Sequence, residues 1–345
     1  MDSSDPAIIR QPKIHLHCHL EGSLRAETFV ELARRSGVST RYRPGGEAID
    51  GPTDPALVYR YADFQEFLLT FAAVSRALAR PDDYARLARE FVADALEQNV
   101  VYGELFISPS VWSFFHPELD IVATIRTLIQ ELRAAKDVNF SLIVDVTRNF
   151  GAEGAMETAQ LVAPLAGEGV IGIGLGGDEV RFPPELFADV FAFARANGLH
   201  TVAHAGEAGG PESVSRALAI GAERIGHGIR ALEDPAVVAE LRERRIPLEV
   251  CPGSNYATGV VKAGDIHPVA ALDAAGLIVT IDADDPTMFA TSITREYDYV
   301  ARELGMPALQ RFIGNAVEAS FLEPTAKQAL RERVSAEPLS RIAKF

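Results

Sequence analysis

The chain has 345 residues, of which 48% are apolar and 23% charged, and its formal net charge is −15. This composition is typical of a globular protein that buries an extensive core. The acidic balance argues against nucleic acids and anionic membranes as partners, because phosphate groups are recognised by clustered Lys and Arg.

Two cysteines, Cys18 and Cys251, are too few for a disulfide framework and favour a reducing cytoplasm. Residues 1–11 contain no apolar segment like that of a signal peptide. No stretch approaches the roughly 20 apolar residues that a membrane span needs. We therefore expect a soluble, cytoplasmic protein, monomeric or homo-oligomeric, with neither a membrane nor a nucleic acid as partner.

The first third of the chain predicts one strand and three helices. Residues 14–18 predict the strand and residues 26–35 a helix, and the Gly-, Pro- and Arg-rich stretch 37–58 predicts a loop or insertion. A second helix is predicted over 63–79, where aromatic and apolar residues recur at helical spacing, at Phe64, Phe67, Leu68 and Phe71. A third helix is predicted over 82–98, with Asn99 as its end.

From residue 100 onward, short apolar runs alternate with amphipathic stretches. The apolar runs predict strands over 100–107, 140–146, 170–175, 201–203, 224–226, 247–250 and 278–281. Helices are expected between successive strands, among them 121–135 and 156–165, and after the last strand over 289–304. Further helices are expected within 307–345, where they would pack on the outside of the fold.

Eight strands, each followed by a helix, predict an α/β protein whose parallel sheet closes into a (β/α)8 TIM barrel. Extra helices are expected in the first βα insertion and at the C-terminus. No linker divides the chain, so residues 1–345 are predicted to form a single domain. The insertion 37–80 would lie over the active-site face as a lid-like segment. The alternative is a surface excursion whose phenylalanines belong to the core.

The notable polar motifs all fall at the ends of predicted strands. In a parallel barrel these ends share one rim, which is where barrel enzymes keep their active sites. The motifs are His17 with His19, Gly176-Gly177-Asp178-Glu179, His204-Ala205-Gly206-Glu207, Gly226-His227-Gly228, Cys251-Pro252-Gly253-Ser254-Asn255 and Asp284-Asp285-Pro286.

A metal site is the first hypothesis for this rim. His17 and His19 are two residues apart on a strand, so their imidazoles lie on the same face. With His204 and Asp284 they form a nitrogen and oxygen set suited to one zinc ion, with another divalent metal as the alternative. The ion would keep one position for a water, whose pKa would fall toward ~7.

Proton transfer needs further groups, and Glu207 and His227 are the candidates. Glu207 lies three residues beyond His204 and can shuttle a proton, while His227 can orient the water or stabilise charge. Asp285 follows the expected ligand Asp284 and would point toward the substrate.

Other ionisable residues have structural interpretations. His15 lies deeper along the first strand than the expected ligands and is interpreted as polar filler of the barrel core. Isolated histidines are usually structural or exposed, which applies to His116, His200 and His267. Asp178 and Glu179 are either site acids or members of a salt bridge behind the rim.

Taken together, the motifs resemble those of the adenosine deaminase family of metal-dependent amidohydrolase-type barrels. The matching segments occur in the family's order across most of the chain, over 16–22, 177–179, 204–207, 224–228, 254–259 and 284–286. The resemblance implies hydrolytic deamination at C6 of an adenosine-type purine nucleoside by a zinc-activated water, with release of ammonia.

The resemblance also implies the role of each site residue. The zinc ligands would be His17, His19, His204 and Asp284. The catalytic residues would be Glu207, which protonates purine N1, together with His227 and Asp284. Substrate contacts would come from His19, Glu21, the backbone of Gly177 at N3, and Asp285 at N7.

Glu21 bears on which purine is used. Adenosine-specific members commonly carry Asp there, and that side chain meets the ribose 5′-hydroxyl, whereas Glu resembles members that act on free adenine or on 5′-modified adenosines. The runs 177–179 and 254–259 resemble nucleoside-type members. Adenosine and a 5′-modified adenosine such as 6-amino-6-deoxyfutalosine are therefore the candidate substrates, with free adenine as the alternative. Arg148 either pairs with a substrate carboxylate or is a surface-loop arginine.

Two other classes stay open from the sequence. One is another single-metal amidohydrolase; two-metal relatives often use a bridging carboxylated lysine, but no Lys falls at a predicted strand end between Lys136 and Lys262. The other is a catalytically silent binding relative, which would not require the full set of ligands together with Glu207.

Overall fold

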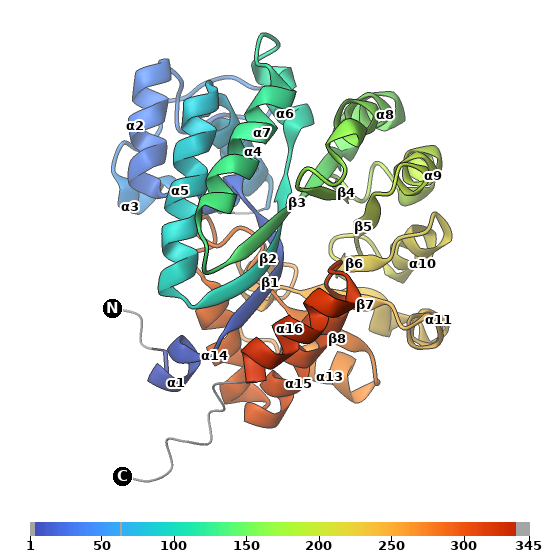
Figure 1. The fold of residues 1–345 in the computed structure, drawn as a ribbon. Helices are drawn as coiled ribbons and strands as arrows, with labels where there is room; N and C mark the ends of the chain where they lie inside the picture. Colours follow the sequence, from blue (N-terminus) through green and yellow to red (C-terminus); the bar gives the residue numbers. More distant parts are fainter. Residues whose placement is uncertain (1–3, 63, 336–345) are drawn as a thin grey trace.

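Eight parallel strands form the centre of the molecule in the computed structural model, which describes residues 4–62 and 64–335 (Figure 1). The strands are β1 (Lys13–His19), β2 (Val100–Ile107), β3 (Asn139–Thr147), β4 (Val170–Gly176), β5 (His200–Ala205), β6 (Arg224–His227), β7 (Pro247–Val250) and β8 (Ile278–Ile281). All eight predicted strands are confirmed. Five of them run further than predicted, and these extensions place His19, His204 and His227 within the strands.

The sheet follows chain order from β1 to β8, each strand pairing in parallel with the next. Its two edges meet through an isolated bridge between Cys18 and Asp284. At this seam the amide of His19 donates to the carbonyl of Asp284 (2.8 Å), and the amide of Asp284 donates to the carbonyl of His17 (3.0 Å). The predicted TIM barrel is confirmed, and its closure passes through three expected metal ligands.

Helices surround the strands, and α8, α9, α10 and α11 lie side by side along one flank (Figure 1). The helices are α1 (Pro6–Arg10), α2 (Ala26–Ser36), α3 (Pro55–Val58), α4 (Phe64–Ala77), α5 (Pro81–Glu97), α6 (Pro109–Phe115), α7 (Ile121–Ala134), α8 (Gly151–Val162), α9 (Ala188–Ala196), α10 (Pro211–Ala219), α11 (Pro235–Arg244), α12 (Pro252–Ala257), α13 (Val269–Ala274), α14 (Ile293–Glu303), α15 (Met306–Ala319) and α16 (Pro324–Ser335). Within residues 4–62 and 64–335 there is no membrane-spanning helix.

The helix predictions needed local correction. Helix α8 begins at Gly151 instead of residue 156, because two glycines in its first turn mask the helical pattern. Helix α14 begins at Ile293 instead of residue 289, since the Ser292 side chain caps it and Ala290 has a φ of 52°. The short α6 was not predicted, and the predicted start of α4 at Asp63 lies outside the described residues.

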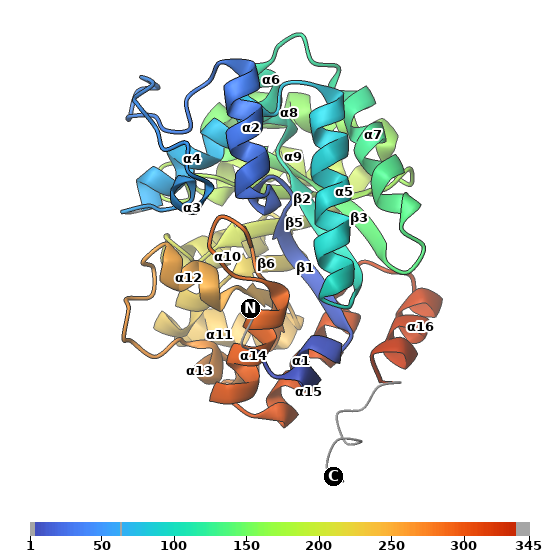
Figure 2. The same ribbon diagram turned by 90° about the vertical axis from the view of Figure 1, so that its left-hand side faces the viewer.

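The insertion between β1 and β2 contains α2, α3 and α4, which group beside one another (Figure 2). Tyr42 joins the main core, but other aromatic residues of the insertion lie apart from it: Phe67 packs with Met288 and Phe289 after β8, and the Tyr61 hydroxyl donates to the Met288 carbonyl (3.0 Å). Phe71 brings its ring centroid to 6.3 Å from that of His19. The lid-like role of residues 37–80 and the single domain over 1–345 stay predictions.

Buried carboxyl groups give the fold a testable pH dependence, and Glu296 on α14 is an example. Its carboxylate is buried, accepts from the Gly253 amide (3.0 Å) and the Thr291 hydroxyl, and has a pKa raised from 4.5 to about 7 by burial. Between these values the native state holds a proton that the unfolded chain has lost. The free energy of unfolding should therefore fall as pH rises from 4.5 to about 7, by up to about 1.4 kcal/mol per pH unit for this group.

Glu296→Gln is expected to flatten that slope by about one proton in urea unfolding at pH 5, 6 and 7. Glu303→Gln, an exposed position of the same helix, serves as the matched control and should leave the slope unchanged. Equal slopes for wild type and Glu296→Gln would show that Glu296 ionises normally.

Candidate functional site

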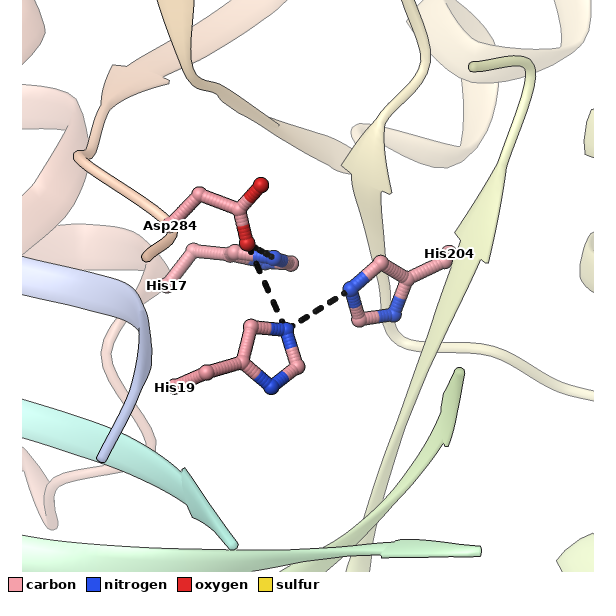
Figure 3. A group of neighbouring side chains, drawn as sticks. All are labelled: His17, His19, His204 and Asp284. Atoms are coloured by element: carbon pink, nitrogen blue, oxygen red, sulfur yellow. Dashed lines mark hydrogen bonds and ion pairs between the residues drawn. The ribbon is translucent and has the colours of Figure 1, made fainter. Parts of the chain in front are cut away.

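Four side chains from distant parts of the sequence converge at the rim (Figure 3). The Nε2 of His19 lies 3.2 Å from the Nε2 of His204 and 3.4 Å from the Oδ1 of Asp284, and the Nε2 of His17 lies 3.5 Å from the same oxygen. Four ligands at 2.0–2.1 Å around a tetrahedral ion stand about 3.3–3.4 Å apart. Two of these nitrogens face each other, and the buried Nε2 of His17 has no hydrogen-bond partner among residues 4–62 and 64–335. The donor set therefore fits a divalent metal.

Local backbone geometry orients these four donor atoms toward one another. His17 and His19 lie on one face of β1, as their spacing predicted, while Asp284 follows β8 with a φ of 61°. Residues other than glycine rarely adopt this left-handed conformation, and such strain gathers at functional sites. The Ser254 hydroxyl donates to the Oδ2 of Asp284 (2.6 Å), which leaves Oδ1 turned toward the histidines.

A buried ionic network stands behind His17. Its Nδ1 lies 2.6 Å from the Oε2 of Glu249, whose other oxygen lies 2.5 Å from the Nε of Arg224. Arg224 also pairs with Glu104 (2.6 Å), and all four side chains are buried. A carboxylate at Nδ1 keeps the proton there, so Nε2 keeps its lone pair for the metal. Side chains of β2, β6 and β7 thus orient the imidazole of His17.

Glu207 lies beside the four donors and is suited to act as an acid. Its side chain is only 12% exposed. Burial raises its pKa well above the ordinary value, and the negative charges of Asp284 and Glu179 add to this. A carboxyl group that keeps its proton near neutral pH can donate it to a substrate.

Glu179 shapes the loop that carries Glu207. Its carboxylate accepts from the amides of four consecutive residues, at 2.5 Å from Gly206, 3.3 Å from Glu207, 3.0 Å from Ala208 and 2.8 Å from Gly209. This backbone nest binds a carboxylate. Neither interpretation from sequence, a site acid or a salt bridge, describes Glu179; Asp178 does form a salt bridge, with Arg181 (2.6 Å).

Glu179→Ala should loosen this loop. The change leaves four backbone amides without their acceptor, so we expect unfolding to become easier by about 1–3 kcal/mol and kcat to fall about tenfold as Glu207 loses its position. Urea unfolding and steady-state kinetics measure the two effects. The control, Glu185→Ala, removes an exposed partner of Arg216 and should stay within about 0.5 kcal/mol. A Glu179→Ala protein as stable and active as wild type would contradict this assignment.

His227 faces the same space from the end of β6, with a φ of 62°. Its Nε2 lies 3.5 Å from the Oε2 of Glu207 and 3.9 Å from the Oδ2 of Asp284. Burial lowers its pKa to about 3, so the ring is neutral in the metal-free protein. The structure thus brings both candidates for proton transfer to the expected ligands.

The expected substrate contacts lie around this cluster. Glu21 is buried, and its Oε1 accepts from the Ser108 amide and the Trp112 indole (both 2.8 Å), while Oε2 has no hydrogen-bond partner in the described part of the chain. Asp285 is also buried and packs so tightly on Gly22 that a Cβ there would stand 1.8 Å from its Oδ1. Gly177 lies just beyond β4 with a φ of 95°. Their roles in substrate binding stay predictions.

One residue received the wrong interpretation from sequence. Arg148 is not a surface-loop arginine: it is fully buried and donates to the carbonyls of Phe182 (2.8 Å) and His204 (2.5 Å). His267 is structural, one of the two outcomes expected for it: it is buried and contacts Asn255, which contacts His227. His15 is buried core, as predicted, with its Nε2 accepting from the Ala283 amide (3.1 Å). These contacts join residues far apart in sequence, so they could not be predicted. The one usable signal was the position of Arg148 directly after a predicted strand, which places it near the rim.

Comparison with known proteins agrees with this geometry. The family model described as Adenosine deaminase matches residues 12–337. The aminodeoxyfutalosine deaminase of Streptomyces coelicolor is 39% identical over 335 residues, which cover 94% of this chain and 83% of that protein. The structure of an adenine deaminase from Arthrobacter aurescens superposes with a TM-score of 0.84 at 28% identity, covering 94% of this chain and 98% of that one. An amidohydrolase from Burkholderia ambifaria with bound Zn gives 0.81 at 26%, covering 96% and 94%. The chain therefore belongs to the adenosine deaminase family.

Proposed function

We propose that this protein catalyses hydrolytic deamination at C6 of an adenosine-type purine nucleoside, and that a 5′-modified adenosine such as 6-amino-6-deoxyfutalosine is its preferred substrate. The observation that carries the reaction type is the convergence of four metal-ligand side chains beside Glu207, whose pKa is raised by burial. The cytoplasm is the proposed location, since both Cys18 and Cys251 are free and buried.

We infer that the resident metal is a single zinc ion held by His17, His19, His204 and Asp284. Three imidazoles and one carboxylate suit zinc, and the matched amidohydrolase contains Zn. When bound, zinc supplies Lewis-acid activation of a water, whose pKa it lowers toward ~7.

The protein's own side chains divide the remaining work. Glu207 donates its proton to purine N1, which makes C6 more electrophilic, and His227 holds the attacking oxygen by a hydrogen bond. Asp285 would hold N7 and the backbone amide of Gly177 would hold N3. Water supplies the oxygen that the substrate gains at C6; of its two protons, one leaves with the 6-amino group as ammonia and the other replaces the proton that Glu207 gave to N1.

Two observations support the choice of a 5′-modified nucleoside. One is Glu21, and the other is a relative whose name contains a substrate of this class. The aminodeoxyfutalosine deaminase is 39% identical over nearly the whole chain. In this protein Trp112 and Ser108 fix one oxygen of Glu21, which leaves the other for a substrate group. Free adenine is the second candidate, because the adenine deaminase structure superposes over 94% of the chain.

A purine panel tests the proposal. We expect kcat/KM to be highest for aminodeoxyfutalosine, lower for adenosine, deoxyadenosine and methylthioadenosine, and lowest for adenine. Glu21→Asp, the matched variant with a shorter side chain, should shift the ratio toward adenosine. A highest kcat/KM on adenine would favour the second candidate, and no ammonia release from any purine by zinc-loaded protein would refute the proposed function.

A further inference from the structure

A buried chain of hydrogen bonds leads from the backbone of α13 to His227. The Val269 amide donates to the Nδ1 of His267 (3.1 Å), and the Nε2 of His267 lies 3.1 Å from the Oδ1 of Asn255. The Nδ2 of Asn255 lies 3.3 Å from the Nδ1 of His227. His267, Asn255 and His227 are all at most 1% exposed, so water does not compete for these contacts.

The Val269 amide fixes which group donates and which accepts in each of these hydrogen bonds. A backbone amide can only donate, so the Nδ1 of His267 must accept and carries no proton. Burial also lowers the pKa of His267 to about 4, which makes the ring neutral. Its one ring proton therefore stands on Nε2 and points at Asn255.

The orientation of the Asn255 amide follows from this proton. An N–H of His267 needs an acceptor, so it faces the carbonyl oxygen of Asn255; the reversed amide would place two donors against each other. The NH2 group of Asn255 then points at His227. The Nδ1 of His227 accepts that bond and carries no proton.

We propose that His267 and Asn255 are positioning residues that hold His227 with its ring proton on Nε2, directed at Glu207 and Asp284. The inference deepens the proposed deamination and rests on it. In this form His227 offers the substrate side a donor and no lone pair. It can hold an oxygen nucleophile in place, but it cannot take a proton from that oxygen through Nε2.

The same proton has a consequence for metal binding. Glu207, His227 and Asp284 lie close enough together to resemble a second metal site. A protonated Nε2 cannot bind a cation, so this trio should stay free of metal. We expect zinc binding to saturate at one ion per chain when free zinc is raised.

The position of the proton is directly measurable. In zinc-loaded protein labelled with 15N-histidine, long-range proton–nitrogen NMR distinguishes a protonated ring nitrogen from a bare one, and the signals missing in His227→Gln identify this residue. We expect His227 to show a bare Nδ1 and a protonated Nε2. A proton on Nδ1 would overturn the proposal whatever the substrate, whereas a correct tautomer without deamination would instead count against the proposed function.

Asn255→Asp should reverse the tautomer. An ionised carboxylate accepts on both sides, which draws the proton of His227 to Nδ1. In a serine protease the wrong histidine tautomer lowers kcat about 10⁴-fold, and we expect a loss of at least about 100-fold here with KM changed less than about threefold. Full kcat, or a proton still on Nε2, would contradict the proposal.

Matched variants separate positioning from damage to the fold. Asn315→Asp makes the same change on α15, where the amide donates to the Val279 carbonyl, and should keep wild-type kcat and Nε2 protonation. His267→Gln retains a donor toward Asn255 and should keep kcat within about fivefold, whereas His267→Leu removes the donor and should lose far more. Equal kcat for these two His267 variants would overturn the proposal even if Asn255→Asp failed to fold.

Discussion

Glu207→Gln is expected to lower kcat for purine deamination by about 10³-fold, within the range usual for loss of general-acid catalysis. Glutamine has nearly the same shape but no proton to give to N1. The Glu207 carboxyl stands 3.5 Å from His227 and is not among the four metal ligands. Metal content should therefore stay at one ion per chain, and KM should change little. Ammonia release and elemental analysis on the same preparation measure both.

Glu212→Gln gives the matched control for this variant. Glu212 lies on α10, five residues further along the same loop and helix, with an exposed side chain. The amide change there should leave kcat within about twofold, as is usual for exposed positions. Full turnover by Glu207→Gln would show that another group protonates the purine.

Removal of the metal with a chelator is expected to abolish deamination and to lower the melting temperature by several degrees. The four proposed ligands come from β1, β5 and the loop after β8, so an ion that they hold would tie distant parts of the folded chain together. An ion that binds only the native state stabilises it by about 4 kcal/mol at a free concentration of about 1,000 times its Kd. Added zinc should restore both properties.

His204→Ala should remove this response to zinc. The variant keeps three of the four ligands but loses the donor that faces His19 at 3.2 Å. His116→Ala is the control, because His116 contacts the Ser75 carbonyl and lies outside the site. It should retain the zinc-dependent rise in melting temperature. An equal rise in His204→Ala would exclude His204 as a ligand.

The strands and the ligand set could be read from sequence because both depend on local pattern. Short runs of three to eight residues predicted the eight strands, and parallel topology alone places residues as distant as His17 and Asp284 on one rim. Helix α8 shows the limit of pattern: its glycines weaken the helical signal, and packing against β3 and α9 overrides their propensity.

The supporting residues were beyond sequence reasoning because each acts through a partner far along the chain. Glu249 is 232 residues from His17, and Arg148 is 56 residues from His204. One usable signal was present in Glu104, Arg224 and Glu249: charged residues inside apolar strands must find partners within the barrel. His267 gave no such signal, since its importance depends on the orientation of Asn255.

The closing hydrogen bonds of the barrel bear on when the protein acquires its ion during synthesis. They join His17 and His19, near the start of the chain, to Asp284, near its end. A nascent chain that has emerged only as far as β7 already carries all three imidazoles but lacks the carboxylate and the backbone bonds that align β1. With the proposed ligand set, stable capture of a metal ion must wait until the ribosome has released the region of β8, which would make metal uptake one of the last steps of maturation.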